Sequence, residues 1–88
     1  MDTSDLKLDG NAIAGTMREL FGIEMTVAPC VCRSCGAREV MACVDVYVNA
    51  PGTVVRCRHC QSVLMTIVRG RDRTWLDPSG LRLVELPS

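Results

Sequence analysis

The sequence predicts a small α+β domain in which one amphipathic helix precedes a series of short antiparallel strands. Apolar residues recur at helical spacing near the N-terminus, and alternating apolar segments separated by turn residues follow. Two Cys-x-x-Cys pairs, Cys32–Cys35 and Cys57–Cys60, lie within the same chain of 88 residues. We interpret residues 1–88 as one domain, because so short a chain buries too little surface to form two cores.

The helix is expected within residues 9–23, after a flexible N-terminus at residues 1–8. Asp9 is a suitable N-cap, and Gly22 fits the glycine position that ends many helices. The apolar stripe between them consists of Ile13, Met17, Leu20 and Phe21. Gly15 is a weak point inside this helix, because glycine lowers helix propensity.

Residues 24–88 are expected to form one antiparallel sheet. Apolar alternation predicts a strand at residues 25–27 and a longer one at residues 43–49, with residues 36–41 as a connector. Asn49-Ala50-Pro51-Gly52 is a strong turn signal, because Pro fixes φ and Gly accepts a positive φ. The strands on either side of this turn should therefore pair as a hairpin.

The second half of the sheet begins with a strand at residues 62–69 that is apolar on both faces. Such a strand should be central and covered on both sides. Residues 70–73 then form a turn, residues 74–77 pair back, residues 78–80 turn again, and residues 81–86 form the last strand. One helix cannot cover both faces of this sheet, which favours self-association.

The two Cys-x-x-Cys pairs indicate a metal site. Each pair places two sulfurs on one tight turn, and two such turns facing each other provide tetrahedral coordination with Zn–S distances of about 2.3 Å. The predicted ligands to one Zn²⁺ are Cys32, Cys35, Cys57 and Cys60. The expected fold is therefore metal-stabilised, since a structural zinc supplies on the order of 10 kcal/mol. Four thiolates leave no open coordination position, so we expect no enzyme and no catalytic residues.

Iron is the alternative metal, because tetrahedral sulfur coordination also suits it. This would make the protein a rubredoxin-like electron carrier. Rubredoxin-type knuckles usually contain Cys-Pro-x-Cys-Gly and lie under several aromatic residues. Here Arg occupies both second positions, and the chain has only one Trp, one Tyr and one Phe. The sequence therefore favours zinc.

The two remaining cysteines, Cys30 and Cys43, are expected to behave as small buried apolar residues. The alternative is that one of them replaces a predicted ligand. Cys30 lies two residues before Cys32, and pairing across the turn at residues 49–52 would bring Cys43 near the second cysteine pair. His59 lies between two ligands and should point away from the metal, at the surface.

Charge distribution suggests which partners to consider. Basic and acidic residues cancel at ten each, but residues 31–73 contain seven Arg against three acidic residues. The arginines that flank the cysteine pairs are Arg33, Arg38, Arg56 and Arg58. They form a candidate phosphate-binding patch, or they offset the negative charge of a four-thiolate site. Few aromatic residues are present for base stacking, so nucleic acid is the alternative partner and protein contact is favoured.

The cysteines and the N-terminus point to a reducing compartment. Residues 1–5 are acidic and polar and contain no feature of an export signal. The longest apolar stretch, residues 63–68, is far shorter than the roughly 20 residues that a membrane span needs. We therefore expect a cytoplasmic protein with reduced thiols and no membrane partner.

The cysteine turns resemble those of the zinc-ribbon superfamily, and this resemblance covers about residues 30–69. A longer set of segments resembles a small uncharacterised bacterial family classed as a domain of unknown function. These segments are Leu8-Asp9-Gly10-Asn11-Ala12, Glu19-Leu20-Phe21-Gly22 and Val63-Leu64-Met65, together with the cysteine pairs. The resemblance implies a zinc-ribbon type of antiparallel meander with a helical N-terminal addition, and it implies no activity. Our leading hypothesis is a zinc-binding structural module that acts through protein contact or self-association as a homodimer; a nucleic-acid-binding zinc ribbon is the alternative.

Overall fold

The structure is a computed structural model that describes residues 7–49 and 52–86. Its strands are β1 (Lys7–Asp9), β2 (Pro29–Cys32), β3 (Arg38–Val40), β4 (Asp45–Asn49), β5 (Gly52–Arg56), β6 (Val63–Arg69), β7 (Thr74–Asp77) and β8 (Leu81–Val84). Its helices are α1 (Ala14–Phe21) and two 3-10 turns, η2 (Gly10–Ile13) and η3 (Met41–Cys43). The predicted α+β class with antiparallel strands is confirmed.

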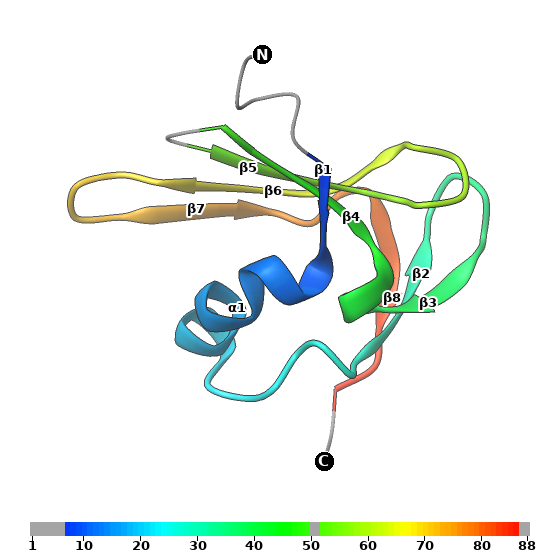
Figure 1. The fold of residues 1–88 in the computed structure, drawn as a ribbon, viewed down its shortest axis with the longest axis horizontal. Helices are drawn as coiled ribbons and strands as arrows, with labels where there is room; N and C mark the ends of the chain where they lie inside the picture. The colour runs from blue at the N-terminus through cyan, green and yellow to red at the C-terminus, as the bar shows by residue number, and fades with distance from the viewer. Residues whose placement is uncertain (1–6, 50–51, 87–88) are drawn as a thin grey trace.

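The strands form two antiparallel sheets instead of the single sheet predicted. Sheet A has the order β1-β4-β5-β6-β7, and sheet B has the order β3-β2-β8. In Figure 1, α1 lies below sheet A, and sheet B stands at the opposite end of the molecule from the β6–β7 hairpin. The predicted meander holds for β4 to β7. It ends there, because β8 leaves sheet A and pairs with β2.

The helical segment is shorter and less uniform than predicted. It starts with the 3-10 turn η2, where the Asp9 side chain accepts a hydrogen bond of 3.0 Å from the Asn11 amide. It ends at Gly22, which has a φ of 74° and donates to the Arg18 carbonyl at 2.7 Å. Both predicted caps are confirmed. Within residues 7–49 and 52–86, no helix has the length and apolar character needed to cross a membrane.

Gly15, in the first turn of α1, can be tested directly. A Cβ atom added there would meet no atom within 4 Å, and the residue is exposed. We expect Gly15→Ala to raise the free energy of unfolding by about 0.5–1 kcal/mol, because alanine has the higher helix propensity. Urea denaturation of the metal-loaded protein measures this change. A lower denaturation midpoint for the variant would contradict it.

Three of the strand predictions are wrong or incomplete. Residues 25–27 are not a strand: Met25 is buried within a loop, whereas Val27 is 67% exposed. The expected connector at residues 36–41 contains β3. Strands β1 and β2 were not predicted; β1 pairs with β4, and β2 pairs with β3 and β8. Of the expected flexible N-terminus, residues 1–6 lie outside the described residues.

The β4–β5 hairpin forms across the predicted turn. Asn49 lies opposite Gly52, and Asp45 lies opposite Arg56. The central turn residues, Ala50 and Pro51, lie outside the described residues. The ladder stops at Asp45 because Cys43 belongs to the 3-10 turn η3, so Cys43 does not join the pairing.

The core lies between sheet A and the segment formed by η2, α1 and the loop after it. Its largest fully buried side chains are Met17, Met25, Met41, Met65, Ile67, Val44, Val46 and Val55. β6 is an interior strand, as predicted, with Met65 and Ile67 buried on the helix side. Its other face is covered only in part, because Thr66 and Val68 are half-buried.

Candidate metal centre

Two hairpin loops with the same backbone geometry carry the four predicted ligands. Knuckle 1 connects β2 to β3 (residues 32–37), and knuckle 2 connects β5 to β6 (residues 57–62). In knuckle 1 the Gly36 amide donates to the Cys32 carbonyl at 3.0 Å, and in knuckle 2 the Gln61 amide donates to the Cys57 carbonyl at 2.9 Å. The first cysteine of each knuckle is buried and the second is exposed. The site therefore connects sheet A to sheet B and opens to solvent on one side.

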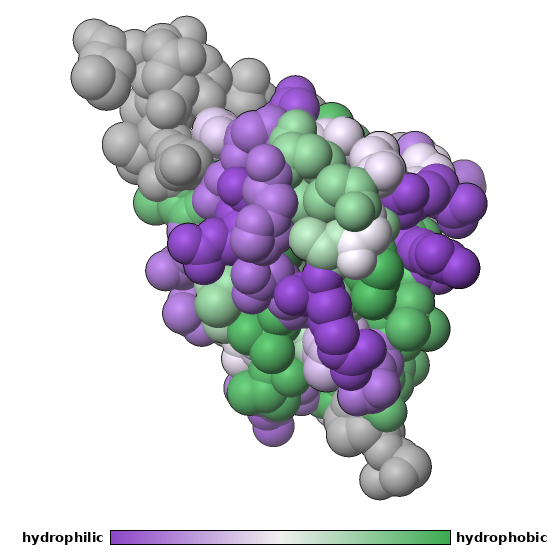
Figure 2. Space-filling view, turned by 90° about the vertical axis from the view of Figure 1, so that its right-hand side faces the viewer, coloured by the Kyte–Doolittle hydropathy of each residue, from purple (hydrophilic) through white to green (hydrophobic). Residues whose placement is uncertain are grey.

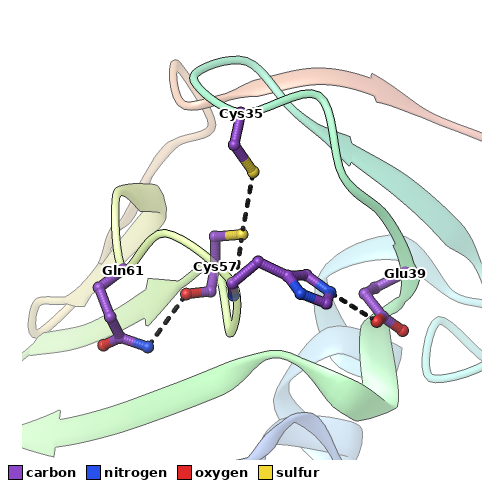
Figure 3. A network of polar contacts seen from close by, with 5 residues as sticks. Cys35, Glu39, Cys57 and Gln61 are labelled. Carbon is purple, nitrogen blue, oxygen red and sulfur yellow. Dashed lines mark hydrogen bonds and ion pairs between the residues drawn. The ribbon is translucent and has the colours of Figure 1, made fainter.

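The four sulfur atoms come together at distances that suit one metal ion. Cys32 Sγ and Cys60 Sγ are 3.7 Å apart, Cys35 Sγ and Cys57 Sγ are 3.6 Å apart, and all four lie within 4.8 Å of one another. Tetrahedral coordination with metal–sulfur bonds of about 2.3 Å requires sulfur separations of about 3.8 Å. A disulfide would require about 2.0 Å. Figure 3 shows Cys35 and Cys57 with their sulfurs facing each other. The donor set and its spacing therefore fit a thiophilic metal ion.

Hydrogen bonds around the sulfurs give the thiols different acidities. The Ser62 side chain and backbone amide donate to the Cys60 sulfur and lower the pKa of this thiol to about 6. The Ala37 amide lowers the pKa of Cys35, but desolvation and the three neighbouring thiols outweigh it and raise this pKa to about 12. The His59 amide donates to Cys57 Sγ at 3.4 Å. Since the raised pKa keeps the Cys35 thiol protonated near neutral pH, a metal ion that binds this sulfur would displace its proton.

Cys30 and Cys43 are not part of the cluster, so the structure does not support the alternative ligand sets. Cys30 is 3% exposed, on the inner side of sheet B. Burial, with smaller contributions from Cys57, Glu39 and Cys32, raises the pKa of this thiol to about 11. A protonated, buried thiol packs as a small apolar side chain. Cys43 is half-buried in η3.

His59 points away from the sulfurs, as predicted. Its Nε2 atom lies 2.8 Å from a carboxylate oxygen of Glu39 in β3, and Figure 3 shows the imidazole reaching the labelled Glu39. This contact attaches knuckle 2 of sheet A to the edge of sheet B. His59 therefore helps hold the two knuckles together from outside the cluster.

Gln61 is a site residue whose importance the sequence did not reveal. It has a φ of 64°, close to the 76° of Gly36 at the matching position of knuckle 1. Its side-chain amide donates to Asp45 at 2.6 Å and to the Cys57 carbonyl at 3.0 Å, and it accepts from the Tyr47 hydroxyl at 3.1 Å. These bonds stabilise a backbone conformation that favours glycine. The sequence signal for this role was the position of Gln61, which directly follows the second cysteine pair as Gly36 follows the first.

Two substitutions at Gln61 separate strain from hydrogen bonding. We expect Gln61→Ala to lower the free energy of unfolding by about 1–2 kcal/mol, because it removes the side-chain bonds and keeps the strain. Gln61→Gly removes both, so it should be about 1 kcal/mol more stable than Gln61→Ala. Guanidinium denaturation of both metal-loaded variants tests this order. Equal stability would show that the positive φ carries no strain.

Most of the arginines near the knuckles already have partners within the chain. Arg33 donates from Nε to the Ser79 carbonyl at 2.9 Å, and Arg56 donates to the Gln61 carbonyl at 2.8 Å. Arg38 forms an ion pair with Glu85 at 3.3 Å. Three of the four arginines of the candidate phosphate patch therefore support the fold around the knuckles.

An apolar cavity of about 210 Å³ lies between α1 and the β7–β8 segment, away from the cysteines. It is lined by Met17, Phe21, Met25, Met41, Met65, Leu76, Pro78, Leu81, Val84 and Leu86. None of these side chains can act as an acid, a base or a nucleophile.

A family model described as a family of unknown function, DUF6510, matches residues 2–88. The chain belongs to this family. No curated protein and no solved structure matches the chain. The expected membership of a family of unknown function is thus confirmed, and what is known of DUF6510 assigns no activity to the cysteine cluster. Its chemistry has to be argued from the geometry of the site.

Proposed function

We propose that Cys32, Cys35, Cys57 and Cys60 hold one structural Zn²⁺ and that the protein is a zinc-ribbon-type contact module without enzymatic activity. The observation that carries this proposal is the clustering of four sulfur atoms within 4.8 Å of one another, with two pairs at 3.6–3.7 Å across the knuckles. Two further findings support it. The cluster joins sheet A to sheet B at a point where α1 does not reach, and four thiolates complete the coordination shell of zinc. The ion would therefore stabilise the fold and would leave no position for a substrate.

Zinc is preferred to iron because of the residues around the cluster. Iron–sulfur electron carriers depend on a sheltered site, since burial and hydrogen bonds tune the reduction potential. Here Cys35 and Cys60 are exposed. Tyr47 contacts Gln61 of knuckle 2 through its hydroxyl group. An exposed thiolate site suits a metal without redox chemistry in a reducing compartment such as the cytoplasm.

Protein contact is preferred to nucleic-acid binding because the arginines near the site are engaged. Arg33 and Arg56 donate to carbonyl groups of the same chain, and the carboxylate of Glu85 offsets the charge of the exposed Arg38. A phosphate-binding surface needs several cations free to replace counterions. Binding to nucleic acid that weakens steeply as salt rises would favour the alternative.

Metal analysis of the freshly purified, reduced protein tests the proposal. We expect about one equivalent of zinc and a colourless protein, since Zn²⁺ has a filled d shell. Replacement by Co²⁺ should produce the absorption of a tetrahedral thiolate complex. Cys43→Ser is the control, because Cys43 lies outside the cluster and its loss should leave the metal content unchanged. Less than half an equivalent of metal would refute the proposal, and a coloured iron protein would replace it with electron transfer.

A further inference from the structure

The outer face of sheet B, on the side away from the core, is partly exposed to solvent. In β2, Cys30 and Cys32 are buried, so Pro29 and Val31 point outward. We call this surface the sheet B face, and its residues are Pro29, Val31, Arg38, Val40, Leu83 and Glu85. Val40 is 36% exposed and Leu83 is 50% exposed.

The strand register arranges these six residues as two rows of three. Val40 pairs with Pro29, and the Glu85 amide donates to the Pro29 carbonyl at 2.8 Å. Arg38 pairs with Val31, which pairs with Leu83 on its other side. Two opposite corners of the face are therefore charged, Arg38 and Glu85, and the other two are apolar, Val40 and Leu83.

The two diagonals of this face differ in chemistry. Arg38 and Glu85 form an ion pair of 3.3 Å that crosses over β2, and both side chains are more than half exposed. Figure 2 shows the side of the molecule where sheet B lies, with apolar surface on both sides of a polar band. With about 3.3 Å per residue and about 4.8 Å between strands, the charged and the apolar diagonals cross at about 70°.

We propose that the sheet B face binds a second copy of this chain in a two-fold symmetric dimer. A two-fold axis along the Val40–Leu83 diagonal places Arg38 of each copy near Glu85 of the other copy. The apolar corners then lie on the axis and meet their own equivalents, and the axis passes between Pro29 and Val31. Because one face presents both members of the ion pair, it is complementary to itself, as a two-fold interface requires.

The pattern of charge selects this partner. The face has one cation and one anion, so it does not match the uniform charge of nucleic acid.

The inference rests on the proposed function, since knuckle 1 is the loop between β2 and β3 and the metal holds that hairpin in place. Three short strands bury little area, so we expect a weak dimer with a dissociation constant on the order of 100 µM.

Sedimentation of the full-length, zinc-loaded protein from about 10 µM to about 1 mM tests the dimer. Arg38→Glu and Glu85→Arg should each be monomeric, because each brings like charges together at both ends of the interface. An equimolar mixture of R38E and E85R should form a heterodimer, since one chain presents two acidic corners and the other two basic corners. Loss of the internal ion pair alone cannot produce this recovery.

The controls separate a specific contact from general charge attraction. Arg71→Glu changes the charge equally but lies at the tip of the β6–β7 hairpin, far from sheet B in Figure 1. R71E should dimerise like the wild type, and its mixture with E85R should give no heterodimer. Leu83→Asp should abolish the dimer while zinc content and the circular dichroism spectrum stay unchanged.

Three outcomes would overturn the inference: a wild-type protein that stays monomeric, dimers that survive R38E and E85R, or a mixture without recovery. Zinc content in the same samples distinguishes the two proposals. A fully zinc-loaded monomer refutes only the dimer, whereas a protein without metal refutes the proposed function.

Discussion

Cys57→Ser is expected to leave the protein without a stable fold at room temperature. Cys57 is 4% exposed, and its sulfur lies 3.6 Å from Cys35 Sγ across the two knuckles. Serine is a poor zinc ligand, so three thiolates would remain for an ion that needs four. Structural zinc supplies on the order of 10 kcal/mol of apparent folding free energy, whereas small proteins have a net stability of about 5–15 kcal/mol. Loss of one ligand should therefore remove most of the free energy of unfolding.

Circular dichroism and amide proton dispersion measure this outcome. The variant should show little β-sheet signal and no cooperative thermal transition, and Cys32→Ser should behave in the same way. Removal of the metal from the wild type with a strong chelator should produce the same unfolded state, and added zinc should reverse it.

Cys43→Ser is the matched control for this experiment. It replaces a sulfur atom by oxygen, as Cys57→Ser does, but in a half-buried residue outside the cluster. We expect it to change the free energy of unfolding by less than about 1 kcal/mol. If Cys57→Ser melts with the same midpoint as Cys43→Ser, the metal does not stabilise the fold.

The sequence allowed the candidate site to be predicted because its geometry is largely local. A Cys-x-x-Cys turn places two sulfurs on one loop through backbone geometry that four consecutive residues determine. Convergence of the two loops is not local, because the β5–β6 hairpin belongs to sheet A and the β2–β3 hairpin belongs to sheet B. Gln61 was harder to predict, because its positive φ is stabilised by Asp45 and Tyr47 in a neighbouring strand.

The difference between local and long-range contacts also explains which parts of the fold were predicted. The helix ends were predicted from Asp9 and Gly22, which act through neighbouring backbone groups. Strands β1 and β3 have three residues each, too few for alternation to distinguish them from a connector. The apolar residues at 25–27 resembled a strand, but Met25 fills the core from a loop. In these three segments, tertiary packing determines whether the backbone forms a strand or a loop.

Pairing of β8 with β2 depends on a contact that no sequence pattern reveals. The Gly80 amide donates to the Leu64 carbonyl of β6 at 3.0 Å, and the Gly80 carbonyl accepts from the Arg33 amide of knuckle 1 at 2.9 Å. Gly80 thus connects sheet A to the first knuckle. A Cβ atom there would lie 1.8 Å from the Val63 carbonyl oxygen and 2.7 Å from Leu64 Cα. Only glycine allows the two backbones to approach so closely.

Gly80→Ala is therefore expected to lower the free energy of unfolding by about 3–5 kcal/mol, because the backbone has to move to relieve the overlap. The same movement should weaken zinc binding, since knuckle 1 loses its fixed position relative to β6. Denaturation of the zinc-loaded variant measures the first effect, and competition with a chromophoric chelator measures the second. Gly15→Ala is the control, because it adds the same methyl group in open space. If the two variants bind zinc equally well, the β7–β8 turn does not position knuckle 1, and the cysteine turns converge without help from the junction between the sheets.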